Sequence, residues 1–397
     1  MDPALELGHP VWDADNHYYE ALDAFTRHLP PGMGPRCVQW AEIEGKKYHV
    51  VGGKVSRAVA NATFNPISKP GCLSEYFRGN PNNVDVLALL KDSEPIRDEY
   101  LHPDARARAL DEQGLEGCFM YPTLGMLYEE ILKDDPEAVC MTFRAFNRWL
   151  LDDWSFDHEG RILNAPYLTL ADADWAVEEL DWVLDQGARL IVMRTAAPTT
   201  LLGRKSPFDP MFDPFWARVD EAGITVVVHA GDSGLSSNGY AVDGFAANFR
   251  GGGFGPSIKS FNIEQAVHDY LLSMTLAGHF AKFPNLRVAS VENGAEFLPD
   301  LFRKLWSQAK KVPGYFKDDP VDIFRHHVWV NPFWEDDLVT VVDQMGADRV
   351  IFGSDWPHIE ALPHPLDYLP ETKPLSDADR KLVLHDNAIE LATLRPR

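Results

Sequence analysis

The stretches that decide the fold are ITVVVHAGD at residues 224–232 and LRVASVENG at residues 286–294. Each begins with a nearly continuous run of β-branched and apolar residues and ends abruptly in an ionisable one, His229 in the first and Glu292 in the second. Apolar residues at consecutive rather than alternate positions are typical of parallel strands that are covered on both faces. Both stretches are therefore predicted to be buried parallel strands with polar carboxyl ends.

Similar runs recur along the chain and alternate with segments of helical period. The predicted strands are 11–15, 117–121, 162–165, 188–194, 224–229, 286–291, 327–331 and 349–354. Eight strands separated by helices favour a (β/α)8 TIM barrel, and an open doubly wound sheet is the competing architecture. We expect one barrel domain over residues 1–397, with an insert after the first strand, about residues 30–102, that acts as a lid or subdomain.

The composition excludes several classes of function. The 397 residues carry a formal net charge of −23, which opposes binding to nucleic acid or to anionic membrane surfaces. No run of about 18 apolar residues is present, and the N-terminus lacks the pattern of a signal peptide. Four cysteines without paired spacing fit a reducing compartment. The sequence thus predicts a cytoplasmic protein that acts on a small molecule.

Ionisable residues follow several of the predicted strands, and in a barrel these strand ends meet at one mouth. The candidate metal ligands are Asp15, His17, His229, Glu292 and Asp355. Alternate residues of a strand point the same way, so Asp15 and His17 can share a face. Three buried carboxylates need a counter-charge, and with two imidazoles they suffice for one divalent ion or a close pair.

Several further residues are expected to support this site. We expect Asp13 and Glu20 in a second shell behind the ligands, with Asp13 orienting His17 or serving as a simple cap. His358 could donate a proton to a leaving group or hold Asp355. Arg194, at the end of the fourth predicted strand, could bind a substrate anion, or could form a structural salt bridge.

The motif D-x-D-x-H-x-x-E at residues 13–20, HFAKFPNLRVASVENG at 279–294 and GSDWPH at 353–358 resemble the amidohydrolase superfamily. The similarity is greatest to its aminocarboxymuconate-semialdehyde decarboxylase-like branch and weakest between residues 29 and 102. It implies a (β/α)8 barrel with one or two divalent ions, iron, manganese or zinc, and a homodimer or higher assembly. The branch's paired histidines fall on Asp15 and His17, its strand-five ligand on His229 and its strand-eight aspartate on Asp355.

The resemblance also carries a departure. Decarboxylase-like members usually have a His-Gly-Gly type sequence after the sixth strand, where this chain has Glu292-Asn293-Gly294. We therefore expect a hydrolase, in which a metal-activated water, with Asp355 as general base, cleaves an ester, thioester, amide or lactone. A metal-dependent decarboxylase on the same scaffold is the nearest alternative. A metal-free glycosidase using Glu292 and Asp355, and a ligand-sensing barrel without activity, are the others.

The insert suggests what the substrate could be. Residues 36–80 contain seven Lys/Arg and three Asp/Glu, although the rest of the chain is strongly acidic. A cationic insert beside the mouth would favour an anionic substrate, unless these residues are simply a solvated face. Aromatic residues including Phe64, Phe245, Phe249 and Phe254 could line an apolar pocket. The glycine-rich residues 231–255 are expected to form an active-site loop.

Overall fold

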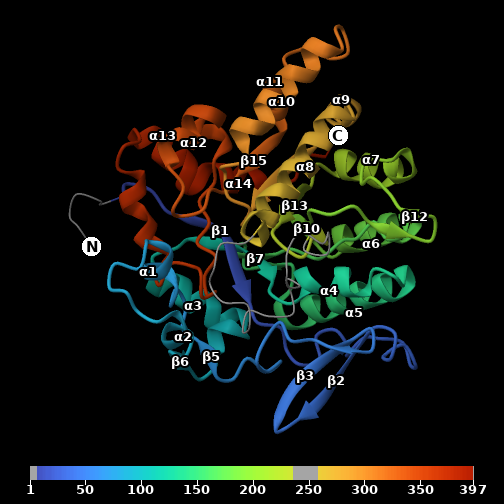
Figure 1. The fold of residues 1–397 in the computed structure, drawn as a ribbon, viewed down its shortest axis with the longest axis vertical. Coiled ribbons are helices and arrows are strands. Elements are labelled where there is room, and N and C mark those ends of the chain that lie inside the picture. Colours follow the sequence, from blue (N-terminus) through green and yellow to red (C-terminus); the bar gives the residue numbers. More distant parts are fainter. Residues whose placement is uncertain (1–6, 236–257, 397) are drawn as a thin grey trace.

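The protein is described here by a computed structural model that covers residues 7–235 and 258–396. Its centre is built from parallel strands in two hydrogen-bonded sheets (Figure 1). These strands are β1 (Trp12–Tyr18), β7 (Gly117–Pro122), β9 (Ile162–Asn164), β10 (Leu190–Arg194), β13 (Thr225–His229), β14 (Arg287–Val291) and β15 (Val328–Val330). The short β8 (Asp157–His158) adds to β9 in antiparallel direction.

Backbone hydrogen bonds outside the assigned strands close these two sheets into a ring. Val192 N donates to Pro166 O and Leu168 N donates to Val192 O, both at 3.0 Å, which joins the β9 side to β10. Residues 350–356 close the other gap, because Ile351 N donates to Val330 O at 3.0 Å and Ala14 N donates to Phe352 O at 2.8 Å. The predicted barrel is confirmed.

The eighth predicted strand, 349–354, occupies its expected place but is not a regular strand. Ser354 N donates to the Asp13 carboxylate at 2.9 Å instead of to a backbone carbonyl. Asp355 then adopts a φ of 59°, which turns the chain out of the extended conformation. A side chain of β1 thus replaces part of the hydrogen-bond ladder here.

Helices cover the outside of the ring (Figure 1). They are α3 (Pro103–Gln113), α4 (Gly125–Leu132), α5 (Pro136–Trp154), α6 (Ala173–Asp185), α7 (Asp213–Ala222), α8 (Asn262–Leu276), α9 (His279–Lys282), α10 (Leu298–Lys311), α11 (Pro320–His327), α12 (Leu338–Met345), α13 (Asp377–Lys381) and α14 (Asn387–Ala392). Gly278, whose φ of 68° is left-handed, separates α8 from α9. The N-cap of α13 is Ser376, whose side chain accepts from Asp379 N. No described helix has both the length and the hydropathy to cross a bilayer.

The insert after β1 has secondary structure of its own. It contains the antiparallel sheet of β2 (Val38–Ile43), β3 (Lys46–Val51) and β4 (Lys54–Val55), the pair β5 (Ile67–Ser68) and β6 (Ser93–Glu94), and the short helices α1 (Ser74–Phe77) and α2 (Val86–Leu89). In Figure 1 these blue and cyan elements lie along one side of the barrel, with β2 and β3 projecting from it. The domain boundary expected at residue 30 stays a prediction.

Backbone contacts hold the insert against the segment that follows Asp355. Gly71 N donates to His358 O and Leu73 N donates to Ile359 O, each at 2.9 Å. Gly71 has a φ of 64°, and a Cβ there would lie 2.4 Å from Pro363 N, so only glycine fits. The insert is thereby fixed beside the carboxyl ends of β1 and of the closing segment.

Candidate metal centre

The first strand supplies two of the candidate ligands. All seven residues of β1 are buried, and Asp15 and His17 are each 1% exposed. His17 pairs in register with Tyr121 of β7, which places it at the carboxyl end of both strands. Buried ionisable groups in this position need partners, because burial without compensation disfavours charge.

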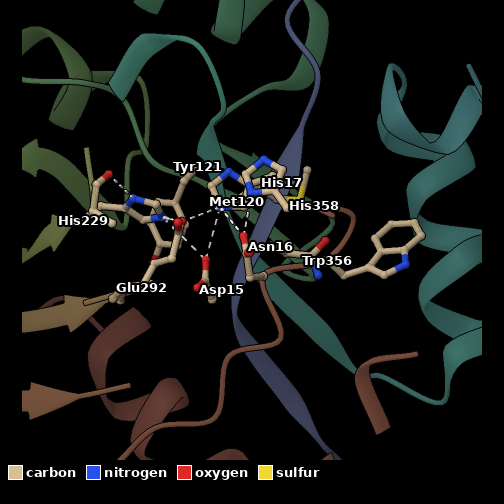
Figure 2. A network of polar contacts seen from close by, with 12 residues as sticks. Asp15, Asn16, His17, Met120, Tyr121, His229, Glu292, Trp356 and His358 are labelled. Carbon is tan, nitrogen blue, oxygen red and sulfur yellow. Dashed lines mark hydrogen bonds and ion pairs between the residues drawn. The ribbon is translucent and has the colours of Figure 1, made fainter. Parts of the chain in front are cut away.

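Residues from four parts of the ring converge on His17 (Figure 2). His17 Nε2 lies 3.4 Å from Asp15 Oδ1, 3.3 Å from Asp355 Oδ1 and 3.5 Å from Glu292 Oε2. His229, at the end of β13, lies 3.2 Å from Glu292 Oε2 through its Nε2. The structure thus brings all five predicted ligands into one cluster.

The donor atoms of this cluster fit a divalent cation. Asp15 Oδ1, His17 Nε2 and His229 Nε2 are buried and lack hydrogen-bond partners among the described residues, and the buried Asp355 Oδ1 faces His358 Nδ1. His229 Nδ1 lies 2.8 Å from Ala230 O, and a proton on Nδ1 leaves the Nε2 lone pair directed at the cluster. The ligand atoms form two overlapping groups, each within 4.8 Å, around Asp15 with His229 and around Asp355 with His358. This donor set fits the predicted divalent-metal site.

Burial and neighbouring charges shift the pKa values of the clustered side chains in different directions. Burial would raise the pKa of Asp15, but contacts with His17 and His229 hold it at about 2. Burial, and secondly the carboxylate of Glu292, keep the pKa of Asp355 well above its ordinary value. The pKa of His358 is lowered to about 3, first by burial and then by His17. A cation at the centre would remove this conflict.

Two of the clustered carboxylates lie on strained backbone. Glu292 and Asp355 have φ values of 55° and 59°, in the left-handed region that non-glycine residues seldom adopt. Such conformations cost about 1–3 kcal/mol each and gather at functional sites. In both cases the turn directs a carboxylate at the end of a strand toward His17.

Asp13 and Glu20 stand behind the cluster but act on backbone rather than on the ligands' side chains. Asp13 accepts from Asp15 N at 3.1 Å and from Ser354 N and Oγ at 2.9 and 2.5 Å. Burial raises its pKa to about 7. Glu20 accepts from Leu124 N and Gly125 N at 2.7 and 3.0 Å, and burial raises its pKa to about 7. Asp13 does not contact the His17 ring through a hydrogen bond, contrary to the expected orienting role.

Arg194 does not serve the cluster in this structure. Its guanidinium is 4% exposed and is held by Glu130 at 2.7 Å, by Glu129 at 3.3 Å and by the carbonyl of Asp232 at 2.7 Å. Two carboxylates therefore neutralise it, and it does not line the cavity described below. The expected role as substrate anchor is not supported, and the structural salt bridge is what the geometry favours.

His358 lies directly against the cluster. Its Nδ1 is 2.6 Å from Asp355 Oδ1, its ring stacks on that of His17 with centroids 3.9 Å apart, and its Nε2 is 3.1 Å from Thr123 Oγ1. Both His358 and Asp355 are therefore placed where a proton could pass between them.

A cavity of about 360 Å³ opens over the cluster. His17, His229, Glu292 and His358 line one part of it, and the described lining contains no lysine or arginine. Several cationic residues of the insert are engaged elsewhere, for example Arg36 with Asp135 and Lys69 with Asp92. The expectation that these residues bind an anionic substrate is not supported. The predicted loop at 231–255, with Phe245, Phe249 and Phe254, lies outside the described residues from 236 on.

Arg106, which supports the backbone at His17, was not among the residues predicted from the sequence. Arg106 of α3 is fully buried, donates to the carbonyl of His17 at 2.6 Å and to Asn16 Oδ1, and lies over the Trp356 ring at 4.6 Å. It fixes the backbone that carries His17. An arginine on a helix ordinarily faces solvent. Apart from its position one turn into the helix after the long insert, no local pattern indicated that Arg106 is buried.

The ring of strands and the carboxylate and imidazole cluster at their carboxyl ends define a metal-dependent barrel enzyme. The sequence profile of the amidohydrolase family matches residues 91–391. The chain therefore belongs to the amidohydrolase family, as its motifs predicted.

Relatives refine this assignment. A γ-resorcylate decarboxylase of Polaromonas sp. (strain JS666 / ATCC BAA-500) is 26% identical over 336 residues, which cover 81% of this chain and 98% of that protein. The crystal structure of an amidohydrolase from Mycobacterium avium subsp. paratuberculosis K-10 is 40% identical, has a TM-score of 0.90, and covers 98% of this chain and 100% of that chain. A dihydroxybenzoic acid decarboxylase structure from Polaromonas sp. JS666, with bound manganese and the inhibitor 2-nitroresorcinol, gives a TM-score of 0.57 at 20% identity, covering 81% and 93%.

The decarboxylase relatives overturn one prediction. The chain was expected to be a hydrolase, including a thioesterase, because Glu292 stands where decarboxylase-like members have a histidine. The residue at this one position does not decide the reaction class, because a relative matched along nearly its whole length is a decarboxylase. The structure offers a reason why the position is not decisive, since His358 supplies an imidazole beside the cluster from another loop.

Proposed function

We propose that this protein is a metal-dependent, non-oxidative decarboxylase of hydroxylated aromatic carboxylates. The observation that carries the proposal is the match to γ-resorcylate decarboxylase along 98% of that relative's length. A carboxylate and imidazole cluster beneath a largely apolar cavity is consistent with a substrate that has one charged end and a flat hydrophobic body.

Asp15, His17, His229 and Asp355 would hold the metal, with Glu292 as a fifth ligand or a neighbour to it. When bound, the divalent ion supplies a positive charge that orients the carboxylate and adjacent hydroxyl of the substrate. No described cationic side chain lines the cavity, so the protein's own side chains supply no positive charge to bind the substrate's carboxylate. Manganese is supported by the related structure, and iron and zinc fit the same donors.

Asp355 and His358 would supply the proton. Decarboxylation adds a proton to the ring carbon that bears the carboxylate; the carbon–carbon bond then breaks, its electron pair returns to the ring, and carbon dioxide leaves. Asp355 Oδ1 and His358 Nδ1 share a contact of 2.6 Å, and His358 lines the cavity. The proton would be delivered at the Asp355 carboxyl and replaced through His358, whose Nε2 meets Thr123.

The test is turnover of γ-resorcylate and related hydroxybenzoates by protein loaded with manganese, zinc or iron. In deuterated water we expect carbon dioxide, a phenolic product and one deuterium at the ring carbon that lost the carboxylate. Oxygen from labelled water should not enter either product. Incorporation of that oxygen into an organic product, or no carbon dioxide from any acid with any metal, would disprove the proposal.

A further inference from the structure

The geometry points to a substrate that carries an apolar substituent of several carbons, lodged against the insert. The inference rests on the proposed function and narrows its substrate class from simple hydroxybenzoates to substituted ones. It follows from how polarity is distributed around the cavity and from which part of the chain builds the apolar side.

The insert contributes a continuous apolar face to the cavity, which we call the insert wall. It consists of Ala58, Val59, Phe64, Pro66, Ile67 and Leu90. Phe64 is 2% exposed and stacks on Tyr19 with ring centroids 4.5 Å apart, so the wall is packed against β1's own continuation. Tyr19 in turn donates to Pro357 O at 3.1 Å, next to His358. The wall therefore begins beside the cluster rather than at a separate surface.

Two polar residues of the insert, Asn61 and Ser68, also line the cavity, and their side chains are already engaged. Asn61 donates to Asn65 O at 3.2 Å and accepts from Thr63 N, and Ser68 donates to Leu90 O at 3.1 Å. These groups satisfy backbone atoms of the insert, so they need no partner from a ligand. What the insert offers to a bound molecule is chiefly apolar surface.

Residues from outside the insert continue this surface. Leu124, Met126 and Leu127 at the start of α4 and Ile263 of α8 also line the cavity. A volume of about 360 Å³ lies in the range of about 300–1,000 Å³ that holds drug-sized ligands. A single ring with small polar substituents would leave much of this apolar surface in contact with water.

The insert wall lies outside the stretch that the family profile matches, although so do Asp15 and His17 of β1. The amidohydrolase profile begins at residue 91, after every residue of the wall. The wall is nevertheless fixed in place by the Gly71 and Leu73 contacts with the segment that follows Asp355. The cluster at the strand ends would thus provide the chemistry, while the insert would select the substituent.

The experiment compares γ-resorcylate with its 3-butyl and 4-butyl derivatives. It measures kcat/KM for release of carbon dioxide and, in parallel, Kd by calorimetry for the same acids with manganese-loaded protein under conditions without turnover. Each buried methylene contributes about a fourfold gain. We expect at least one butyl derivative to exceed γ-resorcylate by about tenfold or more in kcat/KM or in affinity.

Two substitutions in the wall and one control locate the effect. Val59→Phe fills the cavity and Ile67→Ser removes apolar contact, and each is expected to reduce the butyl preference by about fivefold or more. Two opposite changes are used so that misfolding of one leaves the other informative. Val55→Phe changes an exposed position of β4 that does not line the cavity and should keep the wild-type preference.

Failure of the inference differs from failure of the proposed function. Carbon dioxide from γ-resorcylate without any butyl preference, or a preference that survives both wall substitutions, overturns the inference alone. No carbon dioxide from any acid, with a calorimetric butyl preference that the wall substitutions abolish, overturns the decarboxylase and supports the apolar subsite. Absence of both turnover and binding overturns the inference as well.

Discussion

Replacement of Glu20 by glutamine separates a structural role for this residue from a role in metal binding. Glu20 is 1% exposed, and its carboxylate accepts from the backbone at the start of α4, between β1 and the cavity. Burial raises its pKa to about 7, against an ordinary value of 4.5. Its proton is therefore held more tightly in the folded protein than in the unfolded chain.

The sign and size of the effect follow from that difference. Below about pH 4.5 the carboxyl is protonated in both states, and burial carries no penalty. Between pH 4.5 and about 7 the folded state binds more protons, so stability falls as pH rises, by about 3 kcal/mol at about 1.36 kcal/mol per pKa unit. A glutamine side chain still accepts a hydrogen bond from α4 but carries no charge. If its buried amide NH₂ group finds no acceptor, the variant loses about 1–3 kcal/mol of stability at every pH.

The assay is urea unfolding of metal-free wild type and Glu20→Gln between pH 4.5 and 8. Relative to wild type, the variant should gain about 3 kcal/mol of stability between pH 4.5 and a pH above 7, whatever its difference at the acid end. Its manganese affinity should be unchanged, since Glu20 contacts α4 and none of the ligands. A stability difference that is the same at pH 5 and pH 8 would refute the linkage argument. A tenfold loss of manganese affinity would instead restore Glu20 to the metal site.

Three more predictions concern the ligands, a remote histidine and Arg194. His229→Ala should weaken manganese binding by about 100-fold or more, read by calorimetry, and an affinity within threefold of wild type would remove His229 from the ligand set. His279, whose pKa burial lowers to about 4, is neutral in the folded state. Stability should fall by about 3 kcal/mol as pH drops from 6.5 to about 4, and His279→Phe should flatten that slope; a wild-type slope in the variant would contradict it. Arg194→Met should destabilise by about 3–5 kcal/mol in urea unfolding, because it removes the buried cation beside Glu129 and leaves Glu130 with Lys133 alone. A variant of normal stability with lost turnover would favour the anchor role instead.

The ligand cluster shows how much of a site can be predicted from local sequence patterns. Asp15, His17, His229, Glu292 and Asp355 were predicted from one rule, that ionisable residues ending parallel strands meet at a shared mouth. The rule holds because strand direction and the twist of a closed barrel fix where carboxyl ends lie, whatever loops join them. The same rule placed Arg194 at the mouth correctly by position, but it could not show that two carboxylates of α4 would neutralise the guanidinium.

Sequence alone thus determined the barrel and the family and predicted which candidate ligands would cluster, because these depend on strand periodicity, strand ends and a few motifs. Only the tertiary structure decided which charges neutralise one another, that Asp13 completes a backbone ladder at residue 354, and that an apolar insert wall faces the cluster. These outcomes depend on contacts between residues far apart in the chain, such as Gly71 with His358. The local periodicity of the sequence cannot predict such a contact, because the contact becomes favourable only when the two segments are packed together.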